Sequence, residues 1–337
     1  MPAATAPAPT APFSRPAARA WTCAPPPAAD VAAFHAALPG YAPTPLVEIP
    51  DLAAELGAAR LFVKDESARL GLPAFKILGA SWGLHRTWRG ERTLLAATDG
   101  NHGRAVAALA RQRGLAARVH VPEGVPDAAR AAIAAEGAEV VAVNGSYEEA
   151  VRRAAAEAGP DALLVQDTAV PGHDDVPARI VEGYSTLFTE IDAQLAAAGA
   201  APAGLVAVPA GVGSLVQAAV THYRSGPARP SVLAVEPADA ACVLAALRAG
   251  APVTLPAART AIAALNCAEV SALAWPVLAA GLDAAVAVTD ADAARGARDL
   301  AAHGVTAGPC GGAALAGARA TAPAAGTVVL LSTDGAP

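Results

Sequence analysis

Lysine is almost absent from this sequence: Lys64 and Lys76 are the only two among 24 basic residues, and all the others are arginine. Aromatic residues are also scarce, at 4% of the chain. No basic stripe with interleaved aromatic side chains occurs, and 30 acidic residues bring the net charge to -6. We therefore expect neither nucleic acid nor an anionic membrane as a partner. The excess of alanine, glycine, proline and arginine indicates a codon-composition bias, so the 54% hydrophobic content overstates how apolar the chain is.

Long hydrophobic runs are absent as well, because glycine, proline and charged residues interrupt every candidate for a membrane-spanning helix. The first residues have no compact apolar block behind their basic side chains, so no signal peptide is predicted. We expect residues 1–28 to be a flexible arm rich in proline and alanine. The four cysteines show no C-x-x-C spacing, which argues against a metal site and a disulfide framework. A reduced, cytoplasmic protein is expected.

Short β-rich runs alternate with alanine-rich segments of helical length. Ser146 and Glu149, for example, form a capping pattern at the start of one expected helix. Such alternation predicts an α/β protein with parallel sheets that are covered by helices on both faces. The runs expected to form strands are 61–63, 93–97, 117–121, 138–143, 162–166, 205–208, 231–236 and 327–332.

Turns that follow the strands are the candidate sites, because open parallel sheets bind ligands at the carboxyl ends of their strands. In the segment 208–220, Gly211 and Gly213 allow tight turns before a helix that begins near Ser214, and such a turn suits a phosphate. An ordinary glycine turn explains these residues about equally well, because neither a Walker loop nor a dinucleotide fingerprint is present.

Further turns carry chemically active side chains. Asp99, Asn101 and His102 lie in a glycine-flanked turn between a strand and a helix, where they can face a ligand or cap the helix. Cys310 precedes another helix, where a lone cysteine is more often a small buried hydrophobic residue than a reactive group. Asp167 and Asp334 each follow a strand, and each is either a turn former or a site residue.

The two retained lysines indicate which chemistry these turns could serve. Arginine cannot lose its proton and attack a carbonyl carbon, so it cannot form a Schiff base. A lysine kept in a chain that otherwise uses arginine hints at amine chemistry, although chance retention must explain at least one of Lys64 and Lys76. A Schiff-base lysine together with a phosphate-binding turn suggests pyridoxal phosphate.

Longer motifs occur in unbroken order from about residue 38 to the C-terminus. They are GYAPTPL, VKDESARLGLPAFKILGAS, ATDGNHGRAVA, VQDTAVPG, PAGVGSL, TAIAALNCAE and LLSTDGA. Together they resemble the diaminopropionate ammonia-lyases within the tryptophan-synthase-β-like (fold type II) pyridoxal-phosphate enzymes. The resemblance implies pyridoxal 5'-phosphate as the cofactor and a homodimer. It also implies a large domain of residues 29–90 and 180–337 and a small domain of residues 91–179, each with a mainly parallel sheet flanked by helices.

Individual roles follow from the resemblance at matching positions. Lys76 matches the Schiff-base lysine, and Asn101 matches the asparagine that bonds the phenolic oxygen of the cofactor. Cys310 aligns with the serine or cysteine that faces the pyridine nitrogen. Asp99 and Asp167 match the two aspartates that distinguish the ammonia-lyases from serine and threonine dehydratases. The phosphate cradle is implied to consist of Gly211, Val212, Gly213, Ser214 and Leu215.

The implied reaction is β-elimination of ammonia from 2,3-diaminopropionate to aminoacrylate, which hydrolyses to pyruvate and ammonia. Lys76 would act as the base, and a nearby carboxylate would hold the departing ammonium and manage its proton. The resemblance further implies that Asp99 takes the α-proton of the D isomer, with Asp167 assisting.

Two alternatives stay open, because the chain departs from the family at several positions; Val170, for example, replaces an aromatic residue. A remodelled site would suit a serine or threonine dehydratase, or a β-replacement enzyme acting on another β-substituted amino acid, for instance in a specialised biosynthetic pathway. A non-catalytic relative that binds cofactor or amino acid is the other alternative, disfavoured by Lys76 and the two aspartates.

Positions outside the implied site carry two more expectations. Cys242 and Cys267 match cysteines of the relatives, and they are either close together near the site entrance or two unrelated buried thiols. Lys64 matches a structural position. We expect arginine to replace it with modest loss, since a charge near Asp65 and Glu66 is the only role its neighbours in the sequence indicate.

Overall fold

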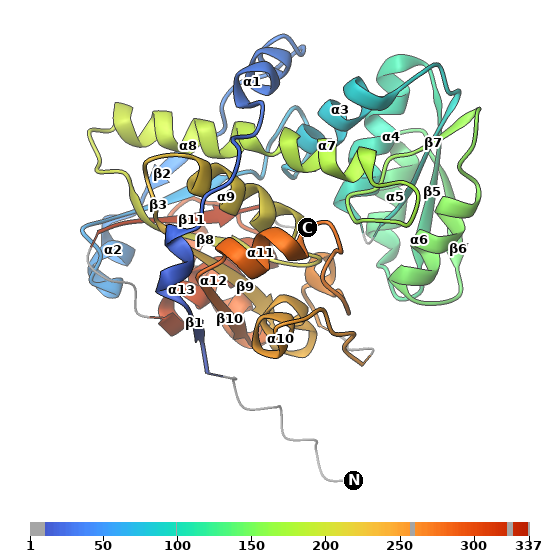
Figure 1. The fold of residues 1–337 in the computed structure, drawn as a ribbon. Coiled ribbons are helices and arrows are strands. Elements are labelled where there is room, and N and C mark those ends of the chain that lie inside the picture. The colour runs from blue at the N-terminus through green and yellow to red at the C-terminus, as the bar shows by residue number, and fades with distance from the viewer. Residues whose placement is uncertain (1–10, 99, 257–259, 322–325, 336–337) are drawn as a thin grey trace.

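The computed structural model of the chain describes residues 11–98, 100–256, 260–321 and 326–335. Within these residues the strands form a larger sheet of seven and a smaller sheet of four (Figure 1). The larger sheet has the order β1-β10-β9-β8-β11-β3-β2. Its strands are β1 (Phe13–Ser14), β2 (Leu46–Glu48), β3 (Arg60–Asp65), β8 (Ala203–Pro209), β9 (Ser231–Pro237), β10 (Ala284–Val288) and β11 (Thr327–Ser332).

Only the two edge strands of the larger sheet, β1 and β2, run antiparallel to their neighbours in the described residues. The inner strands are parallel and almost continuously apolar, as expected when helices cover both faces. In β11, Val329 and Leu331 join one hydrophobic core, and Val328 and Leu330 join the other. The alternation of side chains along each strand thus divides the apolar residues between two faces.

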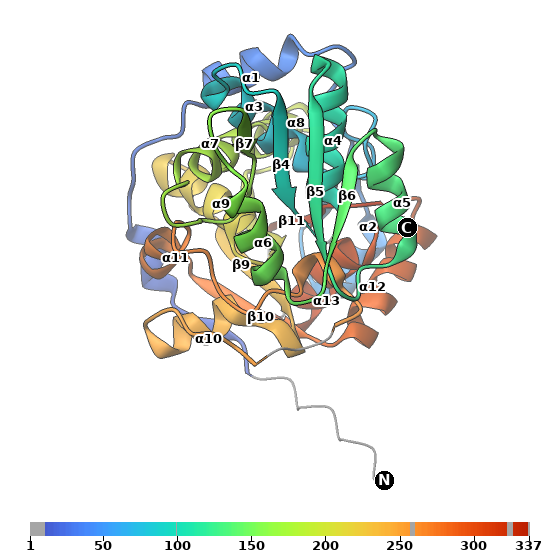
Figure 2. The ribbon, with the colours of Figure 1, turned by 90° about the vertical axis from the view of Figure 1, so that its right-hand side faces the viewer.

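The smaller sheet is entirely parallel in the described residues and has the order β6-β5-β4-β7. Figure 2 shows these strands side by side, and Figure 1 shows them at the end of the molecule remote from β2. They are β4 (Thr93–Ala97), β5 (Ala116–Pro122), β6 (Glu139–Val143) and β7 (Ala162–Leu164). The expected α/β fold with parallel sheets is confirmed.

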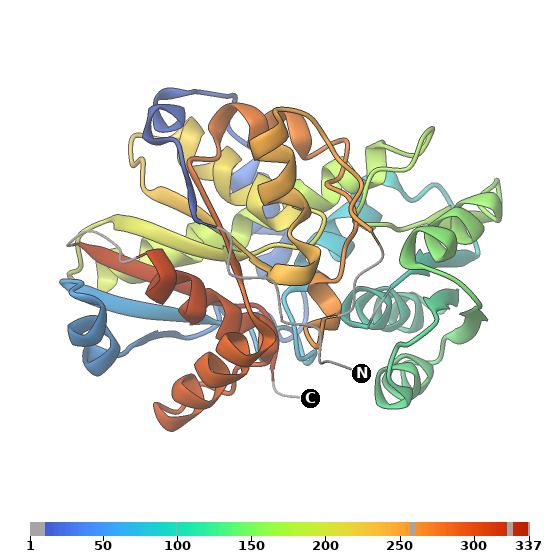
Figure 3. The ribbon, with the colours of Figure 1, turned by 90° about the horizontal axis from the view of Figure 1, so that it is seen from below.

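Helices cover both faces of the larger sheet, and Figure 3 shows α12 and α13 in red on the side opposite the gold and orange helices α9 to α11. None of the helices in the described ranges is long and apolar enough to cross a bilayer. The α-helices are α1 (Ala28–Ala36), α2 (Pro50–Leu56), α3 (Lys76–Thr87), α4 (Asn101–Arg113), α5 (Asp127–Ala135), α6 (Tyr147–Ala156), α7 (Asp175–Gly183), α8 (Ser185–Ala197), α9 (Ser214–Ser225), α10 (Cys242–Ala249), α11 (Trp275–Gly281), α12 (Asp290–Ala302) and α13 (Pro309–Thr321). The 3-10 helices are η1 (Pro16–Ala20), η2 (Ala238–Ala240) and η3 (Ala263–Leu265).

The segment before α1 differs from the expected arm in its described part. β1 pairs with β10 at the edge of the larger sheet. Arg15 donates to the carbonyl oxygen of Ala279 at 2.6 Å, and Arg19 donates to Oδ2 of Asp283, also at 2.6 Å. Residues 11–20 are therefore fastened to the large sheet by backbone pairing and two arginines, while residues 1–10 lie outside the described part.

Candidate active site

A cavity lies where loops at the carboxyl ends of strands from both sheets meet. The loops that follow β4, β7, β8 and β11 all contribute to its wall, together with the start of α3. The structure brings all the described candidate residues into this one wall: Lys76, Asn101, Asp167, Gly211, Val212, Gly213, Ser214, Leu215 and Cys310. Asp99 lies outside the described residues. Convergence follows from topology, since parallel strands point their carboxyl ends toward the same edge.

Lys76 is the first residue of α3, and its side chain is 24% exposed. Its Nζ atom lies 2.5 Å from Oδ2 of Asp167, which follows β7 and is buried. Burial acts to lower the pKa of Lys76, but the charge of Asp167 outweighs it and raises that pKa. Burial acts to raise the pKa of Asp167, but His102 and Lys76 outweigh it and lower that pKa. At neutral pH the two groups form an ion pair.

His102 stands beside this pair and is buried in the first turn of α4. Its Nε2 atom lies 2.8 Å from the carbonyl oxygen of Val165, so Nε2 carries the hydrogen. Nδ1 lies 3.8 Å from Oδ2 of Asp167. Burial lowers the pKa of His102, so the ring is neutral at pH 7 and presents the Nδ1 lone pair toward the carboxylate.

The turn between β8 and α9 fits a phosphate group. Gly213 has a φ of +96°, and a Cβ added there would lie 2.9 Å from Cδ1 of Leu278. A Cβ on Gly211 would lie 3.0 Å from Sγ of Cys267. The positive φ thus requires glycine at position 213, and the close approach favours it at position 211. The turn directs backbone N–H groups at the start of the twelve-residue helix α9 into the cavity wall.

Ser214 connects the turn to the other sheet. Its hydroxyl donates to the carbonyl oxygen of Asp167 at 2.7 Å. This bond ties the loop after β7 to the first residue of α9, so the carboxylate and the anion-binding turn are held in one arrangement.

Cys310 and Asp334 form the part of the wall contributed by α13 and the end of β11. Burial raises the pKa of the Cys310 thiol well above its usual range, so the thiol is neutral. Burial also raises the pKa of Asp334, to about 6. A neutral thiol is a weak donor and acceptor, which suits a neutral ring nitrogen rather than a charged one. The sequence indicated both Cys310 and Asp334, the latter as an aspartate that follows a strand, and the structure places both in the cavity wall.

Cys242 and Cys267 both lie against Gly211. The Cys242 thiol donates to the carbonyl oxygen of Gly211 at 3.4 Å, and Cys267 lines the cavity on the same side. Both are buried, as is Cys310, whereas Cys23 is half-buried, and none of the four forms a disulfide. Of the two expectations for Cys242 and Cys267, the structure agrees with the one that places them close together beside the site.

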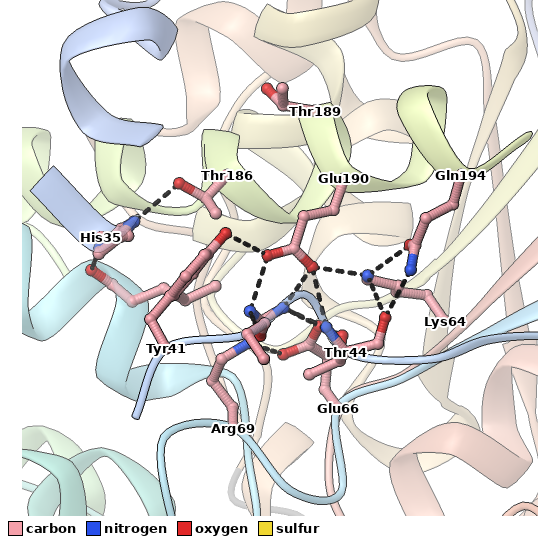
Figure 4. Close-up of polar contacts among 12 residues, drawn as sticks. His35, Tyr41, Thr44, Lys64, Glu66, Arg69, Thr186, Thr189, Glu190 and Gln194 are labelled. Atoms are coloured by element: carbon pink, nitrogen blue, oxygen red, sulfur yellow. Dashed lines mark hydrogen bonds and ion pairs between the residues drawn. The ribbon is translucent and has the colours of Figure 1, made fainter. Parts of the chain in front are cut away.

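A buried charge cluster supports the segment that precedes Lys76. It consists of Lys64, Glu66, Arg69 and Glu190, and Figure 4 shows their dashed contacts converging on Glu190 of α8. Arg69 donates to Oε1 of Glu66 and to Oε1 of Glu190, each at 2.7 Å. Two positive and two negative charges balance, which a buried cluster requires. The cluster fixes residues 65–75, the connection between β3 and Lys76.

Lys64 has a structural role, as the resemblance implied, but its partners are not the acidic neighbours in the sequence. Its side chain is fully buried, and Nζ donates to Oε2 of Glu190 at 2.6 Å, to Oε1 of Gln194 at 2.7 Å and to the carbonyl oxygen of Thr44 at 2.8 Å (Figure 4). Three acceptors surround one compact ammonium, a geometry that a planar guanidinium does not reproduce. The sequence could not reveal this partner, because Glu190 lies on a helix more than a hundred residues further along the chain.

Comparison with the sequences of known proteins agrees with this geometry. Residues 37–334 match the model of the family described as "Pyridoxal-phosphate dependent enzyme". The chain is 34% identical over 304 residues to a diaminopropionate ammonia-lyase of Salmonella typhimurium, covering 81% of this chain and 75% of that protein.

Solved structures of similar proteins agree with the sequence match. The Escherichia coli diaminopropionate ammonia-lyase in complex with an aminoacrylate-PLP azomethine intermediate is similar with a TM-score of 0.83 and 30% identity, covering 91% of this chain and 88% of that one. A threonine deaminase from T.th. is similar with a TM-score of 0.80 and 27% identity, covering 91% of this chain and 97% of that one.

Proposed function

The chain belongs to the pyridoxal-phosphate dependent enzymes, and from this premise we propose that it is an ammonia-lyase acting on 2,3-diaminopropionate. β-Elimination of the second amino group gives aminoacrylate, which hydrolyses to pyruvate and a second ammonia. The observation that carries the choice of substrate is the carboxylate of Asp167, buried in the cavity 2.5 Å from Nζ of Lys76. A substrate with a second ammonium can use this carboxylate, whereas a hydroxy amino acid has no second cation for it to bind.

The residues of the wall fit the cofactor. Pyridoxal 5'-phosphate, when bound, withdraws electrons from the α-carbon of an amino acid and so makes its proton removable. Residues 211–215 would hold the phosphate through backbone N–H groups, and Asn101 would bond the phenolic oxygen. The neutral thiol of Cys310 would face the pyridine nitrogen. Lys76 would supply the amine that holds the cofactor and later acts as the base.

Asp167 can serve two cations in turn. It holds the ammonium of Lys76 while that side chain is free. A substrate ammonium brought next to Lys76 comes within reach of the same carboxylate. Once that carboxylate pairs with the substrate instead of Lys76, the pKa of Lys76 falls. Arrival of the substrate therefore turns Lys76 from a charged group into a base.

The proton of the leaving group is the second task of Asp167. An amine departs readily only when it is protonated, because ammonia is a far weaker base than the amide anion. A carboxylate keeps the second amino group in its ammonium form, and the neutral ring of His102 lies beside it. We propose Asp99 as the base that takes the α-proton of the D isomer.

The proposed division of the chain places residues 29–90 and 180–337 in a large domain and residues 91–179 in a small one, with the cavity between them. Closure of the small domain would exclude water from the reacting atoms. We also propose a homodimer in the cytoplasm. Light scattering on the purified chain tests the dimer.

The function is tested by incubating cofactor-loaded protein separately with L- and D-diaminopropionate, L-serine and L-threonine. Keto acid and ammonia are assayed together, because diaminopropionate yields two ammonia per pyruvate and serine yields one. We expect turnover of diaminopropionate with the two-to-one ratio. Turnover of serine or threonine alone would instead assign a dehydratase, and absence of keto acid from every substrate would point to a non-catalytic relative.

Two variants test the acidic side chains. Asp167→Asn is expected to lower kcat/KM for diaminopropionate by about 10²- to 10⁴-fold, since it removes the group that manages the proton. Asp99→Ser is expected to abolish ammonia release from diaminopropionate. If both variants retain wild-type rates, the carboxylates do not act in the reaction and the choice of substrate is wrong.

A further inference from the structure

We infer that Gln166 is a positioning residue that orients Asp167 and Tyr147 toward the second amino group of the substrate. The inference rests on the proposed function for its substrate and on the contacts of Gln166 for its geometry. Gln166 is fully buried between the end of β7 and Asp167, and all four of its polar contacts reach the wall of the cavity. The sequence showed it only as the residue before an aspartate.

The side-chain amide of Gln166 continues the small sheet where the backbone leaves it. β7 ends at Leu164, and the N–H of Val165 still donates to the carbonyl oxygen of Leu95 at 2.8 Å. Beyond this point Oε1 of Gln166 accepts from the N–H of Ala97 at 2.8 Å, and Nε2 donates to the carbonyl oxygen of Ala97 at 3.1 Å. The amide thus pairs with the last residue of β4 as a further strand residue would.

Because the side chain of Gln166 replaces backbone pairing at this point, the backbone of Asp167 can leave the small sheet. The carbonyl oxygen of Asp167 instead accepts from the hydroxyl of Ser214 at the start of α9, at 2.7 Å. Gln166 therefore lets the chain turn from one sheet to the other without leaving Ala97 unpaired, which would leave two buried backbone groups without partners. The carboxylate of Asp167 is directed into the cavity at this turn.

The second hydrogen of the Gln166 amide faces two side chains of the cavity wall, Tyr147 and Asp167. Nε2 of Gln166 donates to the hydroxyl oxygen of Tyr147 at 2.8 Å and lies 3.5 Å from Oδ1 of Asp167. Oδ2 of the same carboxylate faces Lys76. Because an amide nitrogen only donates, the Tyr147 oxygen must accept, and the hydroxyl hydrogen points away from Gln166. Gln166 thus sets the orientation of both the Tyr147 hydroxyl and the Asp167 carboxylate.

Orientation of this kind matters for a substrate with two amino groups. The carboxylate must reach the second ammonium while Lys76 reaches the α-carbon, and a misplacement of about 1 Å can cost about 10²-fold in rate. Charge matters too: a glutamate at position 166 would put a second carboxylate beside Asp167 and raise the pKa of that aspartate.

Three variants separate positioning from simple support of the fold. Gln166→Glu keeps the length and one acceptor but loses both donors and adds a charge. Gln166→Met keeps the length and removes every hydrogen bond. Gln112→Glu makes the same chemical change on the exposed side of α4 and is the matched control.

The first readout does not depend on activity. Since the chain has only two lysines, protein made with 13C-labelled lysine gives one signal for Lys76 and one for Lys64, assigned with Lys76→Arg. In the cofactor-free chain we expect the Lys76 signal to move in both Gln166 variants, because its carboxylate partner is displaced, while the Lys64 signal stays. Gln112→Glu should move neither.

The second readout is kinetic. Gln166→Met is expected to raise KM for diaminopropionate by about 10- to 100-fold with a smaller change in kcat, since binding geometry is lost. Gln166→Glu should in addition move the acid limb of the kcat/KM profile to higher pH, because Asp167 then ionises at higher pH.

The outcomes are distinct. The inference is overturned if the Lys76 signal does not move in either Gln166 variant. It is also overturned if both lysine signals move and the thermal midpoint falls, because this result would indicate that Gln166 has only a structural role. If the wild-type chain releases no ammonia from diaminopropionate, the proposed function fails, and the lysine signals still decide whether Gln166 positions Asp167.

Discussion

Oδ2 of Asp167 lies 2.5 Å from Nζ of Lys76, although one residue follows a strand of the small sheet and the other begins a helix next to the large sheet. The contact spans the two sheets and is buried on the Asp167 side. A buried carboxylate at this distance keeps the free lysine charged, and a substrate ammonium that pairs with the carboxylate instead lets the lysine lose its proton and act as a base. The site is thus arranged to respond to the charge of what enters it.

Lys76→Arg should remove covalent attachment of the cofactor and lower activity by at least about 10²- to 10⁴-fold, since arginine neither forms the bond to the cofactor nor acts as a base. Borohydride reduction followed by mass spectrometry of peptides measures the attachment directly. Finding the cofactor mass on Lys64, in the variant or in the wild type, would show that the reactive lysine has been misassigned.

Lys64→Arg should destabilise the fold and leave the chemistry of Lys76 intact. A larger, planar cation must fit a fully buried site shaped for an ammonium with three acceptors, so we expect a loss of about 1–3 kcal/mol in the free energy of unfolding. Urea titration measures this loss.

The matched control is Arg60→Lys, whose ion pair with Glu48 lies at the surface. It should change the free energy of unfolding by no more than about 1 kcal/mol. Equal, small effects of the two substitutions would mean that the buried cluster tolerates either cation.

Gly213→Ala should weaken cofactor binding. The residue has a φ of +96°, and the new Cβ would meet Cδ1 of Leu278 at 2.9 Å, so the turn has to move. Gly57→Ala is the control, since Gly57 also has a positive φ of +67° but has no atom within 4 Å of its added Cβ.

Fluorescence titration with pyridoxal phosphate compares the two glycine variants. We expect a rise in the dissociation constant of at least about tenfold for Gly213→Ala, equivalent to roughly 1.4 kcal/mol, and none for Gly57→Ala, whose effect is confined to stability. Equal affinities would show that this turn does not contact the phosphate.

Glu236 should make stability fall as the pH rises. Both its oxygens accept from the start of α10, from the N–H groups of Val243 at 2.7 Å and Leu244 at 2.8 Å, but burial outweighs these bonds and raises its pKa from 4.5 to about 8. The folded chain therefore binds this proton more tightly than the unfolded chain. Its contribution is complete below about pH 4.5 and is lost as the pH rises to about 8, by roughly 2–5 kcal/mol.

Glu236→Gln tests this assignment, because glutamine stays neutral. Urea unfolding at pH 5.5, 7 and 9 should show the wild type more stable than the variant at the lowest pH, with the difference shrinking or reversing at the highest. A constant difference across the range would mean that Glu236 does not titrate there.

Regular parts of the fold were predictable from the sequence. The apolar run 93–97 coincides with β4, and 327–332 coincides with β11, since buried parallel strands are continuous apolar runs. The candidate residues share one cavity because each follows such a strand or begins the next helix. Three of the described strands escaped prediction. The edge strands β1 and β2 have two and three residues, and neither shows periodicity. The inner strand β10 has the sequence AAVAV, whose alanines resemble those of the helical segments.

Contacts between distant residues could not be read from local patterns. Glu190 gave no sign that it accepts from Lys64 and Arg69, because its own neighbours describe only a helix. Gln166 was passed over for a similar reason, since its importance comes from the backbone that surrounds it. Proline and alanine predicted an arm, whereas Arg15 and Arg19 fasten its described part to the sheet edge.

The buried charge cluster has a consequence for the order in which the chain acquires its reactive amine. Lys64 and Arg69 are synthesised long before Glu190, and burying them without that carboxylate is strongly unfavourable. A nascent chain that ends before α8 therefore has no stable conformation for the connection between β3 and Lys76. The segment that leads to Lys76 is thus fixed only once α8 has packed against it.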